Sequence, residues 1–159
     1  MVKLSANSQT PKKLPHDLAF YMLQIMPERV GLAGEPMFEY NEENYQKIAF
    51  LCDTPFASFG GEEKYKTLAE KAAALFFNTT KDHRLPNGNK RTAVILTCAF
   101  LVFNNKWIKL THQELYDLSL EVAETNREDS EAAYKKVLKI FEERIIDIAE
   151  AEWLIAIEQ

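Results

Sequence analysis

The chain has 159 residues, of which 47% are hydrophobic and 27% are charged, and its formal net charge is −5. This length predicts a single domain, and the acidic balance argues against nonspecific nucleic-acid binding as the main role. No apolar run reaches the ~18 residues that a membrane helix needs, and the N-terminus lacks the apolar core of a secretory signal. We therefore expect a cytoplasmic protein with no nucleic-acid and no membrane partner, in which Cys52 and Cys98 are buried free thiols.

The spacing of apolar residues predicts helices through most of the chain. Residues 1–13 lack an apolar period and are expected to form a flexible N-terminal arm, ahead of one domain over residues 14–159. Helical spacing predicts a first helix over residues 15–26 and a loop over residues 27–40. A second helix is expected to run from a cap at Asn41 to Cys52.

The second half of the chain carries the most apolar of the predicted helices. Helices are predicted over residues 64–81 and 88–104, and the latter is apolar on nearly all sides, which indicates burial. Thr111 and Glu114 form a capping box that opens a helix to about residue 125. Asp129 or Ser130 is expected to cap a helix to residue 144, and residues 145–158 are predicted to continue as helix. The chain is thus predicted to be an all-α bundle.

Between two of these helices lies a stretch rich in groups that suit phosphate chemistry. It runs from residue 83 to residue 91 and reads His-Arg-Leu-Pro-Asn-Gly-Asn-Lys-Arg. The helix that starts here would present free backbone N–H groups and the positive end of its dipole, and Lys90 and Arg91 in its first turn need a compensating anion. Gly88 permits close approach of the backbone to a phosphate, and a neutral His83 beside that phosphate can accept a proton from an incoming hydroxyl group.

This stretch resembles the active-site motif of the Fic/Doc (Fido) superfamily, written His-Pro-Phe-x-Asp/Glu-Gly-Asn-Gly/Lys-Arg, and its lysine is similar to the Doc (death-on-curing) branch. The resemblance implies an all-α Fido-type helical bundle with a short flap or β-hairpin before the central helices. It implies His83 as the catalytic base and a set of nucleotide-phosphate ligands: Gly88, Asn89, Lys90 and Arg91. A second segment, Phe59, Gly60 and Gly61, is similar to the flap that binds the target protein through its backbone.

Three positions depart from the family pattern. Arg84 and Leu85 stand where proline and phenylalanine are usual, and we expect Leu85 to keep the role of anchoring the loop to the core. Asn87 stands where the family has the Asp or Glu that binds Mg²⁺. Because Mg²⁺ favours carboxylate and phosphate oxygens, a metal at Asn87 is expected to be held weakly.

The resemblance leaves three functions open. The lysine at position 90 implies a Doc-like toxin that transfers a phosphoryl group from ATP to a hydroxyl of a target protein, with an antitoxin in trans. Relatives with glycine at that position transfer AMP, so AMPylation is the first alternative. The second alternative, based on Arg84, Leu85 and Asn87, is a degenerate domain that binds a nucleotide or a partner without catalysis. ATP and Mg²⁺ are the expected cofactors.

Overall fold

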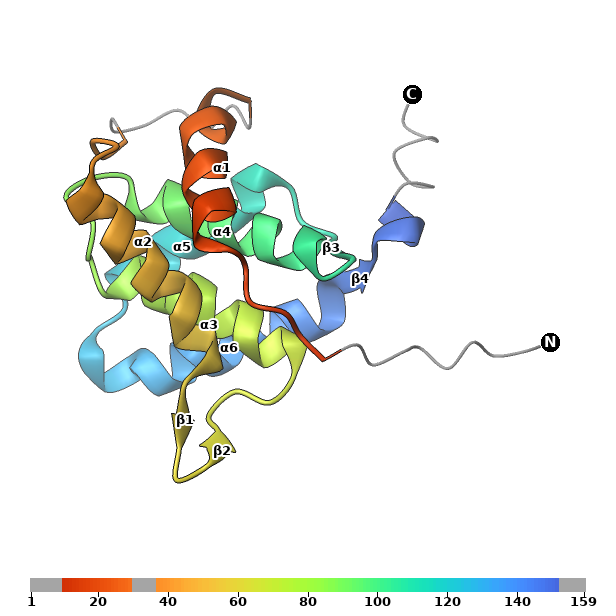
Figure 1. Cartoon of the computed structure of the whole chain (residues 1–159). Coiled ribbons are helices and arrows are strands. Elements are labelled where there is room, and N and C mark those ends of the chain that lie inside the picture. Colours follow the sequence, from red (N-terminus) through yellow and green to blue (C-terminus); the bar gives the residue numbers. More distant parts are fainter. Residues whose placement is uncertain (1–9, 30–36, 152–159) are drawn as a thin grey trace.

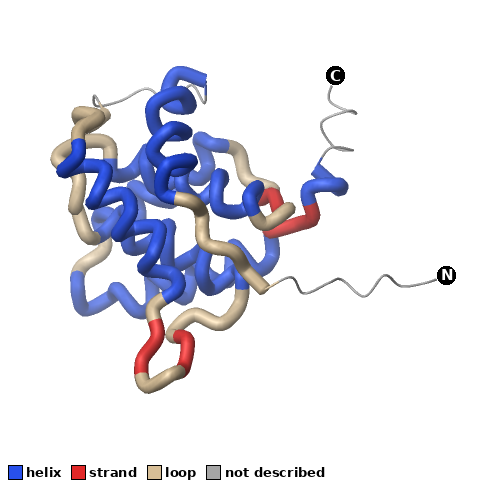
Figure 2. The backbone as a smooth tube through the Cα atoms, viewed as in Figure 1, coloured by secondary structure: helices blue, strands red, loops and turns tan. Residues whose placement is uncertain are grey.

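The structure is a computed structural model, and it describes residues 10–29 and 37–151 as a bundle of helices with two small hairpins (Figures 1 and 2). The prediction of an all-α fold is therefore confirmed. The helices are α1 (His16–Arg29), α2 (Glu42–Asp53), α3 (Leu68–Lys81), α4 (Asn89–Phe103), α5 (His112–Glu124) and α6 (Ser130–Arg144), with short 3₁₀ turns at Thr54–Phe56 and Arg127–Asp129.

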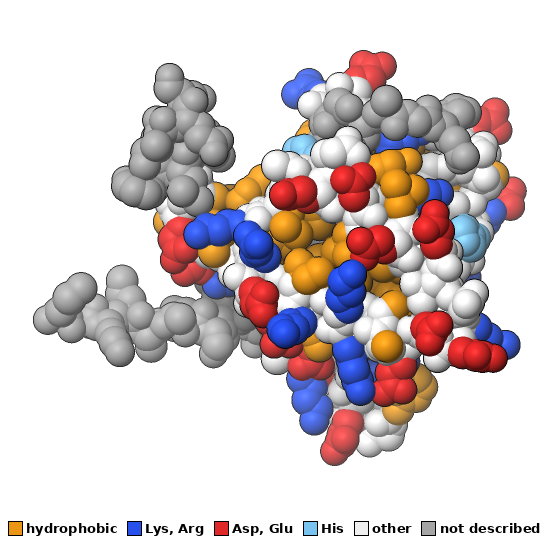
Figure 3. All heavy atoms as spheres, turned by 180° about the vertical axis from the view of Figure 1, so that it is seen from behind, with side chains coloured by type: hydrophobic (Ala, Val, Ile, Leu, Met, Phe, Trp, Pro, Cys, Tyr) orange, Lys and Arg blue, Asp and Glu red, His pale blue; other side chains and the backbone are white. Residues whose placement is uncertain are grey.

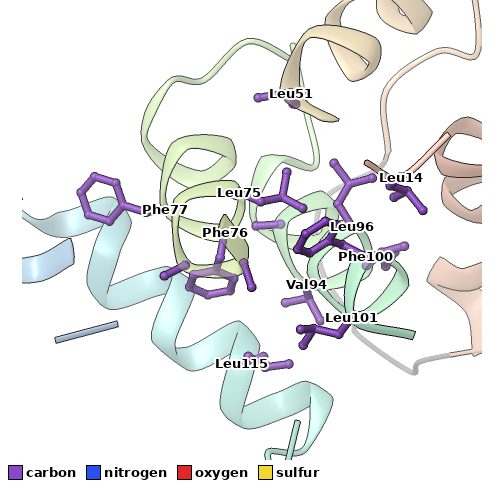
Figure 4. Packing of buried hydrophobic residues seen from close by; sticks show 14 of the residues in the cluster. Leu14, Leu51, Leu75, Phe76, Phe77, Val94, Leu96, Phe100, Leu101 and Leu115 are labelled. Carbon is purple, nitrogen blue, oxygen red and sulfur yellow. The ribbon is translucent and has the colours of Figure 1, made fainter. Parts of the chain in front are cut away.

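The two central helices, α3 and α4, pack along each other in the middle of the bundle. Helix α1 packs on α4 and on α2, whereas α5 and α6 cover the opposite side of the central pair (Figure 1). Leu75 of α3 and Leu96 and Phe100 of α4 belong to the buried cluster between them (Figure 4). The rings of Phe76 and Phe141 lie 5.5 Å apart and join α3 to α6. The site described below therefore lies between the two most deeply buried helices of the fold.

Local capping interactions set several helix ends. The Asn41 side chain accepts the N–H of Asn44 at the start of α2, as predicted. The capping box between Thr111 and Glu114 opens α5 and is also confirmed. Helix α3 was expected to begin at residue 64, but it begins at Leu68 because Thr67 caps it by accepting the N–H of Glu70.

Two other helix ends differ from expectation. Helix α1 continues through Pro27 to Arg29 rather than ending at residue 26. The Asp129 side chain makes no capping hydrogen bond to α6. The flanking segment over residues 30–36, which belongs to the predicted loop, lies outside the described residues.

A short hairpin precedes the central helices, as the expected flap requires. Strand β1 (Ser58–Phe59) pairs antiparallel with β2 (Glu62–Glu63), and the pair protrudes from the helical body (Figures 1 and 2). Gly60 and Gly61 form the two-residue turn with φ values of 59° and 85°, a backbone region that glycine adopts without strain.

A second hairpin corrects the prediction for the C-terminal part of the chain. Residues 145–158 were expected to be helical, yet Ile145–Asp147 form strand β4, which pairs antiparallel with β3 (Lys106–Ile108). Trp107 lies opposite Ile146 in this pair. Helical structure resumes at residues 148–151, and the rest of the predicted helix lies outside the described residues.

The first described residues are attached to the body of the bundle. The backbone N–H of Lys12 donates to Oδ1 of Asn104 at 2.7 Å, and Nδ2 of Asn104 donates to the Lys12 carbonyl oxygen at 3.0 Å. The Lys13 ammonium lies 3.3 Å from the Asp53 carboxylate. The last two residues of the predicted arm therefore contact the bundle, while residues 1–9 lie outside the described part.

Cys52 and Cys98 are free thiols, Cys52 buried and Cys98 half-buried rather than fully buried. Burial raises the pKa of both to about 12. On the surface, acidic and basic side chains are intermingled over the face seen in Figure 3. Within the described residues, no helix is both long enough and apolar enough to cross a bilayer.

Candidate functional site

The candidate site is the loop between α3 and α4 together with the first turn of α4. Asp82 ends α3, and Gly88 precedes the first residue of α4. Within this loop Leu85 is only 3% exposed and belongs to the hydrophobic core, which confirms its expected role as an anchor. The loop is therefore pinned to the bundle at its centre, while His83, Arg84 and Asn87 are exposed on either side of that anchor.

The side-chain amide of Asn89 closes the loop. Its Oδ1 accepts the N–H of Leu85 at 3.2 Å, and its Nδ2 donates to the Leu85 carbonyl oxygen at 2.9 Å. Asn89 therefore does not cap α4 with its side chain. It holds the loop in one conformation by satisfying both backbone groups of the anchoring residue.

Gly88 occupies the N-cap position of α4 with φ of 76° and ψ of 19°. A Cβ atom built on Gly88 would lie 2.8 Å from Sδ and 3.4 Å from Cα of Met37, so a side chain at this position meets both strain and a steric clash. Because glycine has no side chain, no N-cap group accepts a hydrogen bond from the first turn of α4. The free backbone N–H groups of this first turn and the positive end of the helix dipole make the start of α4 suitable for binding an anion.

Arg91 carries the least expected feature of the site. The residue is 9% exposed, and its Nη2 atom is buried without a hydrogen-bond partner among the described residues. Burial raises the pKa of the nearby Tyr40 hydroxyl, and the positive charge of Arg91 opposes that rise. Within the described ranges neither Arg91 nor the half-buried Lys90 forms a salt bridge. Two cations in the first turn of a helix thus lack an acidic partner there, which favours binding of an anion.

His83 lies on the exposed side of the loop and has a left-handed backbone with φ of 46°. For a residue other than glycine this conformation costs on the order of 1–3 kcal/mol. The described part of the chain provides no hydrogen bond to its imidazole ring. The ring is therefore accessible to a ligand.

Arg84 connects the loop to α2. Its guanidinium carbon lies 3.8 Å from the centroid of the Phe50 ring, and its Nε lies 3.8 Å from the Asp82 carboxylate. Phe50 also lines a cavity of about 330 Å³ together with Phe59 of the flap. Phe50 therefore lies next to both the His83 loop and the cavity that the flap lines.

The flap residues predicted to bind a target lie at an exposed tip. The Phe59 side chain is 69% exposed, and a Cβ atom on Gly60 or Gly61 would meet nothing within 4 Å. Backbone groups at this tip are accessible to another polypeptide, which is the requirement for strand pairing.

Asn87 is exposed at the end of the loop, next to Gly88. Among the described residues there is no group of three or more His, Cys, Asp or Glu side chains that could hold a metal ion. Mg²⁺ is commonly bound by one or two protein oxygens plus phosphate and water. Asn87 fits that arrangement only as a single neutral oxygen ligand, so most of the coordination would come from a bound nucleotide.

Sequence reasoning missed three residues that shape the site: Met37, Tyr40 and Phe50. Each is far in sequence from the loop and belongs to no recognisable motif. In the sequence, the one signal for this region is the pair Phe38 and Tyr40, two positions apart. In the structure their ring centroids lie 5.2 Å apart, within the aromatic cluster that fixes the segment over residues 37–41.

A family model described as the Fic/DOC family matches residues 13–101, which is more than half of the chain. The matched range includes the flap, the loop and the whole site described above. Neither the comparison with curated proteins nor that with solved structures found a match.

Proposed function

We propose that this chain, which belongs to the Fic/DOC family, transfers the γ-phosphoryl group of ATP to a hydroxyl group of a target protein. The family generally transfers nucleotide moieties to proteins. Membership of the family does not specify which group this chain transfers, which of its residues act or which cofactors it uses.

The single observation that supports it most is the buried Nη2 atom of Arg91, for which residues 10–29 and 37–151 provide no hydrogen-bond partner. A buried charged group without a partner costs stability, so such groups in proteins are paired with another charge or with a ligand. The guanidinium fork matches phosphate oxygens in geometry and charge. Together with the uncapped first turn of α4, it favours a polyphosphate as the ligand.

In this proposal His83 acts as the general base. Its neutral imidazole accepts the proton of the target hydroxyl group as that oxygen attacks the γ-phosphorus. The new bond joins the target oxygen to phosphorus, the bond from the γ-phosphorus to the bridging oxygen breaks, and ADP leaves. General-base assistance of this kind contributes roughly 10²–10⁴-fold in rate.

Lys90 supports phosphoryl rather than adenylyl transfer. A long cationic side chain at the start of α4 occupies space and adds charge where a glycine would leave room, which changes the phosphate that fits against the helix end. AMP transfer remains the alternative, and intact mass of a modified target separates the two, because the target gains either one phosphoryl or one adenylyl group.

A third reading, a degenerate domain without catalysis, is favoured by the neutral Asn87 at the exposed metal position. The change Asn87→Asp tests it. If the wild type is inactive only for want of a metal ligand, the carboxylate raises Mg²⁺-dependent ATP affinity and restores transfer. Unchanged affinity in Asn87→Asp would contradict a role for this position in metal binding.

Binding of ATP is the first experiment. Calorimetric titration with and without Mg²⁺ compares the wild type, Arg91→Ala and the control Lys136→Ala, which removes an exposed lysine of α6. We expect binding to be lost in Arg91→Ala and kept in the control. Equal affinity in the wild type and in Arg91→Ala would overturn the placement of the phosphates, and no binding to any of the three would favour the degenerate reading.

We further propose a toxin held inactive by an antitoxin in trans. Support for it comes from the Doc-like lysine at position 90. Co-expression with the product of the neighbouring gene should yield a complex in size-exclusion chromatography. A chain that elutes alone in the presence of that product would contradict this partner.

A further inference from the structure

Lys71, near the start of α3, is a lysine whose side chain is only 1% exposed. Its ammonium group lies 3.0 Å from Oε1 of Glu63. It also donates to the carbonyl oxygen of Pro55 at 3.4 Å and to the carbonyl oxygen of Tyr65. The centroid of the Phe56 ring lies 4.7 Å from Nζ. Fully buried lysines are rare unless they are paired, so this group requires an explanation.

The partners of this ammonium come from both stems of the flap. Pro55 precedes β1, whereas Glu63 and Tyr65 lie in and after β2. An ammonium group has three donors, and here three oxygen acceptors surround it. Lys71 therefore ties the incoming stem to the outgoing stem and both stems to α3.

The flap has few interactions of its own with which to hold its position. Both strands have two residues, and all four of these residues are exposed. Beyond the strands, Lys64 N–H donates to the Ala57 carbonyl oxygen at 3.0 Å. An isolated two-stranded hairpin is only marginally stable in water, so its orientation must be set at its base.

Two aromatic contacts at that base each hold a single stem. The Phe56 and Phe100 rings lie 6.2 Å apart and fix the incoming stem to α4. The Tyr65 and Tyr134 rings lie 6.0 Å apart and fix the outgoing stem to α6. Lys71 contacts both stems with its side chain and ties them together to α3.

We propose that Lys71 is a positioning residue that fixes the flap relative to the His83 loop. Helix α3 carries Lys71 near its first residue, and its last residue leads directly into the His83 loop. One rigid helix therefore sets the separation between the flap and His83. The backbone of β1 is thereby presented to a polypeptide at a constant place. The role of the flap in target binding rests on the proposed function, whereas the fixing of the flap by Lys71 does not.

Hydrogen exchange of the flap amides tests this inference without any substrate. Lys71→Met keeps most of the apolar part of the side chain and removes its charge. Glu63→Gln removes the charge of the half-exposed partner of Lys71. Lys66→Met is the matched control, at an exposed position of the same segment. We expect the exchange rate of the Lys64 amide to rise at least about tenfold in Lys71→Met. This factor corresponds to the stabilisation typically lost with a hydrogen bond to a charged group. We expect a smaller rise in Glu63→Gln and none in Lys66→Met.

Core amides of α4, measured in the same samples, separate positioning from general destabilisation. A rise confined to the flap supports the inference, while an equal rise in flap and core, or no rise beyond that of Lys66→Met, overturns it. If Lys71→Met does not fold, Glu63→Gln decides: wild-type flap protection in that variant overturns the inference. The calorimetric affinity for ATP should stay within about twofold of wild type, because the variants leave the first turn of α4 intact. A wild type that binds no ATP would remove the proposed function without changing the exchange result.

Discussion

The Arg84 guanidinium carbon and the centroid of the Phe50 ring are 3.8 Å apart, so the residue that follows the proposed base is stacked on α2. The family usually has proline at position 84, which stiffens the loop through its ring. Here a cation–π contact provides a different restraint at the same point in the loop. The same Phe50 ring faces the cavity that Phe59 of the flap lines.

Removing that ring should loosen the loop without unfolding the bundle. In Phe50→Leu we expect the free energy of unfolding to fall by about 0.5–1 kcal/mol, the size of an exposed cation–π contact. Urea denaturation of Phe50→Leu, Arg84→Met and the double variant measures the coupling between the two side chains. Additive effects of the two substitutions would show that the stack contributes no energy in solution.

Gly88 should tolerate no side chain. In Gly88→Ala we expect a loss of at least about 1–2 kcal/mol from the left-handed backbone alone, and a further loss from the contact with Met37. Gly61→Ala is the matched control, because Gly61 also has a positive φ, of 85°, but open space around it. Thermal unfolding should place Gly88→Ala below Gly61→Ala, and adding Met37→Ala should recover part of the difference. Equal losses in the two alanine variants would argue against a tight contact at Met37.

The positive φ of His83 gives a second backbone test. Both His83→Ala and His83→Gly should abolish transfer while leaving ATP affinity intact, since neither touches the first turn of α4. His83→Gly should nevertheless be more stable than His83→Ala by about 1 kcal/mol, because only glycine adopts this conformation without strain. Chemical denaturation compares the two, and a less stable glycine variant would mean that the loop is not held in this conformation in solution.

Arg91 should affect stability and ligand binding in opposite directions. Arg91→Met retains a long apolar side chain and removes a buried charge whose Nη2 has no hydrogen-bond partner among the described residues, so we expect the unliganded protein to be at least as stable as wild type. The increase in melting temperature produced by saturating ATP should disappear. A marked loss of stability in unliganded Arg91→Met would show that the guanidinium group has a structural partner.

Asp53 should make part of the stability depend on pH. Burial alone would raise the pKa of Asp53, but hydrogen bonds from His16 and Lys13 outweigh it and lower the pKa below its ordinary value. The ionised carboxylate therefore contributes stability above about pH 4, and this contribution is lost as the pH falls through the lowered pKa. The urea midpoint of Asp53→Asn should lie below that of wild type at pH 7 and approach it as the pH falls below about 4. Asp117→Asn, at an exposed position of α5, is the matched control.

Local signals in the sequence predicted most helices and the loop, whereas the flap was implied by the family resemblance. Asn41, Thr111 and Glu114 act through hydrogen bonds to residues three positions away, so a sequence pattern contains all the information. Thr67 carries a similar capping signal at the start of α3. The predicted start of this helix, residue 64, ignores that signal and lies four residues before the observed start at Leu68.

Long-range pairing explains what could not be predicted. Strands β3 and β4 have three residues each and pair across α5 and α6, so no alternation of apolar residues is long enough to reveal them. The contact of Gly88 with Met37 and the stack of Arg84 on Phe50 likewise join residues far apart in the chain. Within the site, the motif identified which side chains matter, but only the fold shows that Arg91 is buried and that Asn89 faces Leu85.

The pairing of β3 with β4 bears on how the protein can be dissected. The range that matches the family model stops at residue 101, yet Phe76 of α3 is covered by Phe141 of α6, and β4 returns directly from α6 to β3. A truncation at residue 101 would expose to water the faces of α3 and α4 that pack against α5 and α6. We therefore expect that a fragment with its site intact extends at least to Asp147.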